Sequence, residues 1–179
     1  MSGKPRLFLV DAGPVIALHQ LGLWERFLHH AQVIVPAVVC SRETIFWPAD
    51  EGAGHPIDLH RDAAGGLLRI VCADAAAVAA VLARFDPVMR ERIDAGEAEA
   101  LAILSAWEGN RPAFCTADGA AARAACLLGF SDNLISLEEA LRGVGLEQRR
   151  LASQFSEEKM NQWRNAGRQM RLRGEGLAG

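Results

Sequence analysis

The apolar run RLFLV, which ends on Asp11 and continues as AGPVIAL, is the feature that most constrains the fold of this chain. A strand buried on both faces of a parallel sheet has this composition, because neither of its faces meets water. Pro14 suits the first turn of a helix, where its missing N–H removes no hydrogen bond. The sequence therefore predicts a strand, a carboxylate and a helix in succession, and open α/β sheets bind their ligands at such strand ends.

Further apolar runs along the chain alternate with stretches that are typical of helices. Strands are expected at residues 7–10, 32–36, 67–73, 112–116 and 133–136. Helices are expected at residues 14–18, 21–30, 36–46, 74–85, 86–93, 94–107, 119–129 and 137–143. Strands separated by helices of this length indicate βαβ units. We therefore expect an α/β protein with a parallel sheet of about five strands flanked by helices.

Local signals support several of these boundaries. Asp74 precedes an alanine-rich stretch and is expected to cap the helix there. Ser136 and Glu139 have the spacing of a capping box, in which each side chain accepts a hydrogen bond from the other residue's backbone N–H. Residues 48–66 are rich in Gly, Pro, Asp and His and are expected to form an irregular insertion.

Charge is unevenly distributed along the 179 residues, whose formal net charge is −3. Residues 149–173 contain seven Arg and Lys residues against two Glu. We therefore expect a basic helical extension, residues 146–179, after a domain of residues 1–145. Nearly all of its cations are arginines, which pair with phosphate through two hydrogen bonds, but a merely solvated terminal helix is the simpler interpretation. No apolar run is long enough to span a membrane, so a cytoplasmic protein is expected. The four cysteines are widely spaced, and neither structural zinc nor a disulfide framework is expected.

Four acidic residues lie where the expected strands give way to helices: Asp11, Glu43, Glu97 and Asp118. Right-handed crossovers send the carboxyl ends of parallel strands to one edge of the sheet, so these acids are expected to converge. Carboxylates in one cleft repel each other, and a bound cation relieves that repulsion. Ligands that offer only oxygen favour hard ions, so the sequence predicts a site for Mg²⁺ or Mn²⁺.

Three of these acids can be weighed against a purely structural role. Asp118 directly precedes a helix and can cap it. Glu43 can be an exposed helix residue paired with Arg42. Asp11 is expected to be a poor cap, because Gly13 is better placed immediately before the helix-starting proline. A functional role is therefore favoured most strongly for Asp11.

Glu97 has two explanations that its spacing leaves open. It lies three residues after Asp94, which is the spacing of a capping box. It also shares a helix face with Leu101, and a face that points into the fold would bring its carboxylate to the sheet edge. Glu99 falls on a different face of the same helix and is expected to be solvated.

These segments resemble the PIN-domain family of metal-dependent nucleases, which includes VapC-type toxin ribonucleases. The matching segments are LFLVDAGPVIAL, VIVPAVVCSRE, DAGEAEALAIL and FCTADGAAARAACLLGF, which cover most of residues 6–141 in the expected order. The resemblance implies a Rossmann-like sheet of about five parallel strands. It places the family's acidic quartet on Asp11, Glu43, Glu97 and Asp118.

The resemblance also implies an activity, the hydrolysis of RNA phosphodiester bonds with Mg²⁺ or Mn²⁺. Asp11, Glu97 and Asp118 would be the catalytic residues and hold the metal, and Glu43 would be a further metal ligand or position water. The implied partners are RNA, an antitoxin protein and a second copy of the chain in a homodimer.

The sequence also departs from the family pattern. Members usually follow the first acid with Thr or Ser and then Asn or Ser, whereas this chain has Ala12 and Gly13. Thr116 does match the pattern, and Thr116 and Arg123 are the expected contacts with nucleic acid. The missing hydroxyl favours the main alternative, a PIN-like module that binds a protein or RNA partner with weak or no catalysis.

A third interpretation is a hydrolase or phosphotransferase that uses Asp11 as a nucleophile. Haloacid-dehalogenase-type enzymes need a second Asp two residues later, where this chain has Gly13. Neither a phosphate-binding Gly-rich loop nor a GxSxG motif is present in the sequence. The nuclease and the binding module therefore remain the two leading hypotheses.

Overall fold

A five-stranded, all-parallel sheet forms the centre of this computed structural model, which describes residues 6–43, 46–47, 55–147 and 150–179. Its strands are β1 Leu7–Val10, β2 Gln32–Pro36, β5 Arg69–Val71, β6 Ala113–Cys115 and β7 Leu134–Ile135. The order across the sheet is β5-β2-β1-β6-β7. The predicted α/β class and five-stranded parallel sheet are confirmed, and the arrangement is Rossmann-like.

The strands are buried on both faces, as the continuous apolar runs predict. Phe8 and Val10 of β1 pack into one hydrophobic cluster, whereas Leu9 between them packs into the other. This alternation follows from the two-residue repeat of a strand. Phe8, Leu9 and Val10 are all fully buried, so β1 is the centre of both cores.

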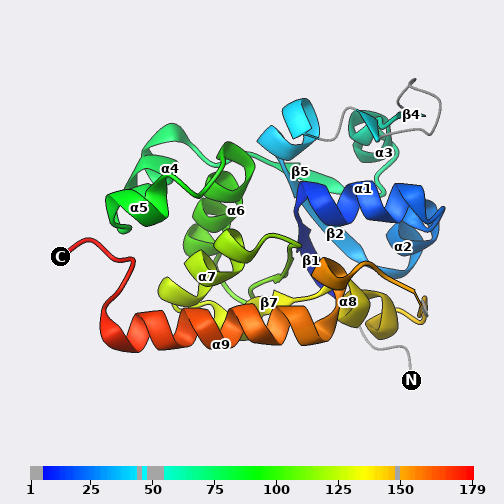
Figure 1. The fold of residues 1–179 in the computed structure, drawn as a ribbon. Helices are drawn as coiled ribbons and strands as arrows, with labels where there is room; N and C mark the ends of the chain where they lie inside the picture. Colours follow the sequence, from blue (N-terminus) through cyan, green and yellow to red (C-terminus); the bar gives the residue numbers. More distant parts are fainter. Residues whose placement is uncertain (1–5, 44–45, 48–54, 148–149) are drawn as a thin grey trace.

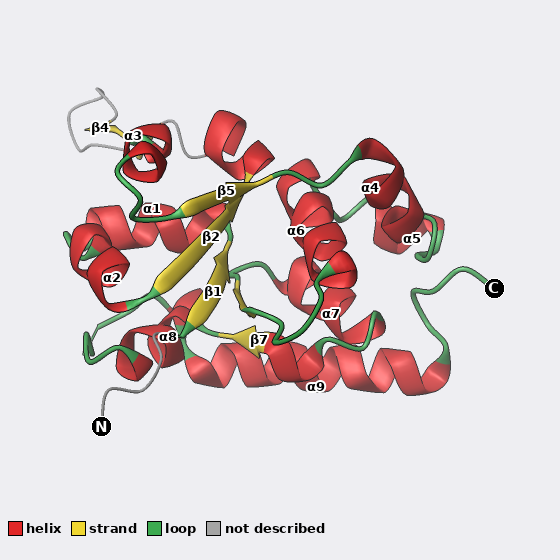
Figure 2. Ribbon diagram, turned by 180° about the vertical axis from the view of Figure 1, so that it is seen from behind, coloured by secondary structure: helices red, strands yellow, loops and turns green. Residues whose placement is uncertain are grey.

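Helices cover both faces of the sheet (Figures 1 and 2). The cluster that contains Phe8 also receives residues of α1 Ala12–Gln20, α2 Trp24–His30, α3 Leu59–Ala64 and α8 Leu137–Gly143. The cluster that contains Leu9 receives residues of α4 Ala75–Leu82, α5 Pro87–Arg90, α6 Ala95–Ala106, α7 Gly119–Leu127 and α9 Glu157–Arg173. The chain therefore forms three layers, with the sheet in the middle.

Predicted helix caps at Asp74 and Ser136 are confirmed. The Asp74 side chain accepts a hydrogen bond from the backbone N–H of Ala77, and Ser136 and Glu139 form the predicted capping box. The prediction that Asp11 is a poor cap is wrong. Helix α1 begins two residues earlier than expected, and Asp11 Oδ1 accepts the backbone N–H of its first residue at 2.8 Å.

The region between β2 and β5 differs from the prediction in two ways. Of the helix expected over residues 36–46, the described part contains the π-helical segment η1 Val39–Glu43. Phe46 belongs instead to β3 Phe46–Trp47, which pairs antiparallel with β4 His55–Pro56. The expected irregular insertion contains α3, whose cap Asp58 accepts the backbone N–H of Arg61. Residues 48–54 of that insertion lie outside the described part of the chain.

The C-terminal extension contains a short 3₁₀ turn, η3 Ser153–Phe155, and the helix α9, which runs alongside α7 (Figure 1). Met160 of α9 is fully buried in the core. A Cβ atom on Gly167 would lie only 2.6 Å from Cβ of Cys126, so the two helices approach closely at a residue without a side chain. The predicted division at residue 145 stays a prediction.

A short 3₁₀ turn, η2 Ser131–Asn133, leads into the edge strand β7. No helix in the described part of the chain is both long and apolar enough to cross a membrane.

Candidate functional site

An acidic pocket of about 270 Å³ lies where the strand order changes direction. β1 is the middle strand, with β2 and β5 on one side and β6 and β7 on the other. Ligands of open parallel sheets bind at this switch point, outside the carboxyl ends of the strands. The pocket is lined by Asp11, Ala12, Gly13, Asp94, Glu97, Ala117, Asp118, Gln154 and Phe155.

The structure brings together three of the four acids that the sequence singled out, Asp11, Glu97 and Asp118. Asp11 follows β1, Asp118 follows β6, and Glu97 lies in the first turn of α6. Glu43 is the last residue of η1, after β2, and its side chain lies outside the described part of the structure.

Asp11 is almost fully buried and is held from two sides. Its Oδ1 caps α1, and its Oδ2 accepts a hydrogen bond from Oγ1 of Thr116 at 2.7 Å. Its backbone N–H donates to the carbonyl of Cys115 at 3.0 Å, which ties the end of β1 to β6. Burial raises the pKa of Asp11 from 3.8 to about 6, although both side-chain hydrogen bonds act in the opposite direction.

Thr116 connects two of the acids. Its hydroxyl donates to Asp11, and the same oxygen accepts the backbone N–H of Asp118 at 3.1 Å. Thr116 has no exposed surface, so its position does not support the direct nucleic-acid contact expected from the sequence. Its role in the structure is to position Asp11 and Asp118 relative to each other.

Asp118 both caps a helix and lines the acidic pocket. It is the N-cap of α7, and its Oδ1 accepts the backbone N–H groups of Ala120 and Ala121 at 2.6 and 3.0 Å. Both capping bonds use the same oxygen, so Oδ2 takes no part in the cap. A carboxylate can therefore stabilise the helix start and still face a ligand in the pocket.

Glu97 likewise combines both of its explanations. Its backbone N–H donates to Asp94 Oδ1 at 2.8 Å, and its Oε2 accepts the backbone N–H of Asp94 at 3.0 Å, which completes the capping box. Burial, followed by the negative charge of Asp118, raises the pKa of Glu97 from 4.5 to about 9. The charges of Asp94 and Asp11 act in the same direction.

Asp94 lines the pocket as well, although its spacing from Glu97 predicts only a helix cap. A capping box with two acidic members places both carboxyl groups at one helix end, and that pattern was visible in the sequence. Gln154 and Phe155 of η3 were missed for a different reason. They come from the C-terminal extension, and no local signal shows that it returns to the strand ends.

The prediction that Glu99 is solvated is wrong, because it is only 3% exposed. Helix α6 is buried on all sides from Gly96 to Leu104, so it has no solvent face there for Glu99 to occupy. The carboxylate accepts the backbone N–H groups of Val38 at 2.7 Å and Ala73 at 3.2 Å. Glu99 thus ties the segments that follow β2 and β5 to α6.

Arg123, the other expected nucleic-acid contact, does not line the acidic pocket. It lies on α7, and its guanidinium is beside Gly119 and close to Trp163 of α9. A role in contacting a substrate at the acids is therefore not supported by its position.

The donor chemistry of this pocket fits a divalent cation. Its acids offer only oxygen, and two of them have raised pKa values because burial and neighbouring negative charges disfavour their ionised forms. Among the described residues, no three His, Cys, Asp or Glu side chains form a group that could hold a metal ion as they stand. A scan against models of known protein families and a search of curated proteins find no match to this chain.

Proposed function

We propose that this chain is a metal-dependent nuclease that hydrolyses RNA, as its resemblance to the PIN-domain family implies. The observation that carries the proposal is the gathering of Asp11, Asp94, Glu97 and Asp118 around one pocket at the switch point of the sheet. A cation offsets the repulsion between such carboxylates and favours their ionised forms. The choice of Mg²⁺ or Mn²⁺ follows from donors that are all oxygen atoms.

The residues of the pocket have separable roles in this proposal. Asp11, Glu97 and Asp118 would hold the ion, with Glu43 as the further ligand expected from the sequence. A bound divalent ion lowers the pKa of a water molecule and neutralises charge on the leaving oxygen of a phosphodiester. Thr116 fixes the positions of Asp11 and Asp118 relative to each other, because it forms a hydrogen bond with each residue.

Glu97 couples metal binding to proton release. Its pKa of about 9 means that the carboxyl group is protonated near neutral pH in the metal-free protein. Metal ligands must be deprotonated, so a cation that binds Glu97 displaces this proton. The apparent affinity for the metal is therefore expected to increase with pH.

A specific observation favours the second candidate, a binding module with weak or no catalysis. Ala12 and Gly13 line the pocket at the positions where the family pattern carries hydroxyl or amide side chains. No side chain at these two positions can orient water or metal. The presence of the acids around the pocket favours the nuclease.

The proposal is tested by cleavage of a labelled single-stranded RNA while Mg²⁺ or Mn²⁺ is titrated from zero. Wild type is expected to cleave only with metal, and Asp11→Asn to lose activity at least about 100-fold, since removing one group that stabilises transition-state charge has effects of this size. Glu25→Gln is the matched control, because Glu25 is an exposed acid of α2 away from the pocket. A DNA strand of the same sequence tests the choice of RNA.

Two results would contradict the nuclease. One is the absence of metal-dependent cleavage by pure wild-type protein, which would favour the binding module. The other is cleavage that persists unchanged in Asp11→Asn, which would show a contaminating activity or a different site. The toxin resemblance adds an antitoxin protein, a homodimer and a cytoplasmic location to the proposal.

A further inference from the structure

A second and larger cavity, of about 1260 Å³, lies at the amino-terminal ends of the strands, whereas the acidic pocket lies at their carboxyl ends. Its lining includes Leu7, Ala113 and Leu134, which are the first residues of β1, β6 and β7. Asp11 and Asp118 of the acidic pocket instead follow the last residues of β1 and β6. Because the strands are parallel, the two cavities lie at opposite ends of the same strands.

Arginine is the dominant charged residue of this cavity. We call it the arginine groove, after its five lining arginines: Arg6, Arg111, Arg142, Arg164 and Arg168. Two carboxylates, Asp132 and Glu139, also line it, so cations exceed anions by three (5 − 2). Most of its other lining side chains are uncharged and polar, including Asn161 and Asn165.

The two carboxylates leave much of this positive charge uncompensated. Asp132 pairs with Arg168 at 2.7 Å, and Glu139 is engaged in the capping box of α8. Arg142 pairs with Glu157, which lies outside the groove lining. In the part of the chain that the structure describes, the other three groove arginines form no salt bridge.

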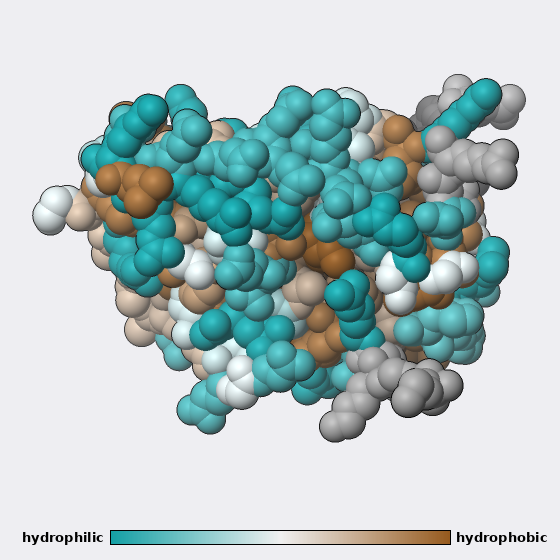
Figure 3. All heavy atoms as spheres, turned by 90° about the horizontal axis from the view of Figure 1, so that it is seen from below, coloured by the Kyte–Doolittle hydropathy of each residue, from teal (hydrophilic) through white to brown (hydrophobic). Residues whose placement is uncertain are grey.

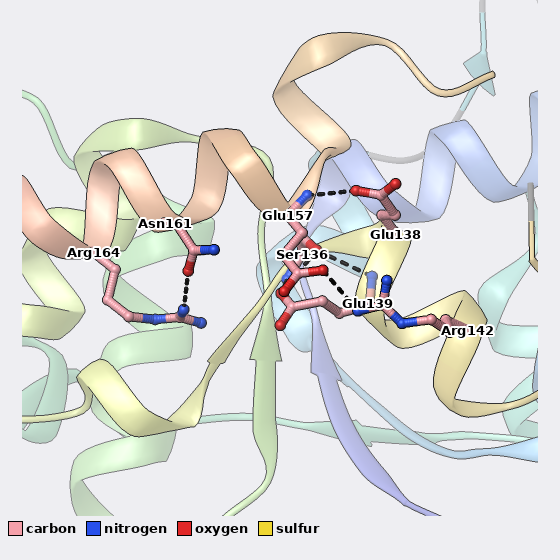
Figure 4. A network of polar contacts seen from close by, with 7 residues as sticks. All are labelled: Ser136, Glu138, Glu139, Arg142, Glu157, Asn161 and Arg164. Carbon is pink, nitrogen blue, oxygen red and sulfur yellow. Dashed lines mark hydrogen bonds and ion pairs between the residues drawn. The ribbon is translucent and has the colours of Figure 1, made fainter. Parts of the chain in front are cut away.

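Two of these three are nevertheless held in place by neutral partners. Arg164 donates from Nη2 to the carbonyl of Leu134 at 2.8 Å and from Nη1 to Asn161, and its Nε is buried without a hydrogen-bond partner among the described residues (Figure 4). Arg111 donates from Nε to the carbonyl of Leu104 at 2.8 Å and lies over the ring of Phe130. Both keep further N–H donors for a ligand.

Ordered guanidinium groups of this kind favour phosphate. Arginine offers two parallel N–H donors that match a phosphate group, and fixing the side chain beforehand reduces the entropy lost on binding. The cavity is larger than the usual 300–1,000 Å³ of a small-molecule site. A chain of phosphates therefore suits the groove better than a single small anion.

Helix α9 connects the groove with the acidic pocket. Gln154 and Phe155, which lie just before this helix, line the acidic pocket. Arg164 and Arg168 of the helix itself line the arginine groove. These arginines lie about 10 and 16 Å along the helix axis from Glu157, at a rise of about 1.5 Å per residue. The face of the molecule on the α9 side is predominantly hydrophilic (Figure 3).

We propose that the arginine groove binds the phosphate backbone of single-stranded RNA and anchors a strand whose other part lies at the acidic pocket. The second part of this inference, that the bound strand reaches the acidic pocket and is cleaved there, rests on the proposed nuclease function. RNA binding in the groove itself needs neither metal nor cleavage. An acidic peptide is the competing occupant, because carboxylates also pair with arginine. The continuity along α9 favours the RNA strand.

The experiment measures binding of a fluorescent single-stranded RNA by anisotropy in EDTA, where no metal-dependent cleavage occurs. The variant is Arg6→Gln with Arg168→Gln, which removes two groove cations; the Asp132 partner of Arg168 is 90% exposed and stays solvated. The control is Arg61→Gln with Arg84→Gln, which removes the same charge from exposed residues outside both cavities.

The groove variant is expected to bind RNA at least about tenfold more weakly near 0.1 M salt, and the slope of log affinity against log salt should fall by about 0.7 per lost phosphate contact. The control should match wild type. Equal losses in both double variants, or no loss in either, would overturn the inference. So would a poly-glutamate peptide that competes as well as unlabelled RNA at equal charge.

Failure of the groove and failure of the nuclease give different results. Wild type that binds RNA through the groove in EDTA but never cleaves it with metal would refute the nuclease and leave the groove intact. Metal-dependent cleavage with the same KM and kcat in wild type and groove variant would refute the groove and leave the nuclease intact. A raised KM with unchanged kcat in the variant is the result expected if both proposals hold.

Discussion

Replacing Asp11 with Asn should remove a pH-dependent loss of stability that the buried carboxyl imposes on the metal-free protein. The pKa of Asp11 is 3.8 as a free side chain and about 6 in the fold, chiefly because of burial. A group whose folded pKa is raised contributes most to stability below its unfolded pKa. That contribution disappears as the pH rises through the folded value. Asp11 therefore lowers the stability of the wild-type protein mainly as the pH rises from about 4 through about 6.

The size of this loss follows from the two pKa values. A difference of one pKa unit corresponds to about 1.4 kcal/mol, so the full difference for Asp11 is about 3 kcal/mol. About 2 kcal/mol of this falls between pH 4 and pH 8. In a chain of this size that corresponds to about 4–8 °C in the melting temperature. Asp11→Asn keeps an oxygen for the helix cap but carries no titrating charge.

The assay is urea unfolding of wild type and Asp11→Asn in EDTA at several pH values. The free energy of unfolding of the variant, relative to wild type, should rise by about 2 kcal/mol from pH 4 to pH 8. Glu108→Gln is the control, because Glu108 is an exposed acid that does not line the acidic pocket. Saturating Mg²⁺ should stabilise wild type at pH 8 and have little effect on Asp11→Asn. Parallel curves for wild type and Asp11→Asn would refute the reasoning.

Two further substitutions test the supports of the site. Thr116→Val keeps the shape of the side chain but removes the hydroxyl that bridges Asp11 and Asp118. The free energy of unfolding measured in urea should therefore fall by about 1–3 kcal/mol, and the metal concentration needed for cleavage should increase. Thr116→Ser, which keeps the hydroxyl, should retain most of the metal affinity; equal metal dependence in Thr116→Val and wild type would contradict the bridging role. Glu99→Gln replaces one of two acceptor oxygens with an amide donor that faces a backbone N–H. The free energy of unfolding measured in urea should therefore fall by about 1–3 kcal/mol. The exposed Glu108→Gln should be neutral, and a neutral Glu99→Gln would show that these two hydrogen bonds contribute little.

The sequence predicted the strands and their parallel arrangement well because buried strands leave long apolar runs. The run that contains Phe8 and Leu9 needs partners on both faces, and only a sheet between two helical layers provides them. Helix starts at Asp74 and Ser136 were predictable because each cap forms within four residues of the chain. Such local signals need no knowledge of the rest of the fold.

The errors concern interactions between distant segments or a competing local signal. Pro14 suggested a helix start, but the aspartate three residues earlier supplies the cap, and proline is also tolerated later in the first turn. Glu99 was misjudged because its two partners come from segments 26 and 61 residues away. Gln154 was missed because the path of the chain back to the strand ends depends on how α9 packs on α7.

The contribution of Gln154 and Phe155 to the pocket has a consequence for biosynthesis. The ribosome adds them 36 residues after Asp118 (154 − 118), so the carboxylates emerge well before the segment that completes their surroundings. A nascent polypeptide that ends before Gln154 therefore contains the acids but lacks part of the pocket lining. The finished pocket can form only after the C-terminal extension has been translated and has packed against α7.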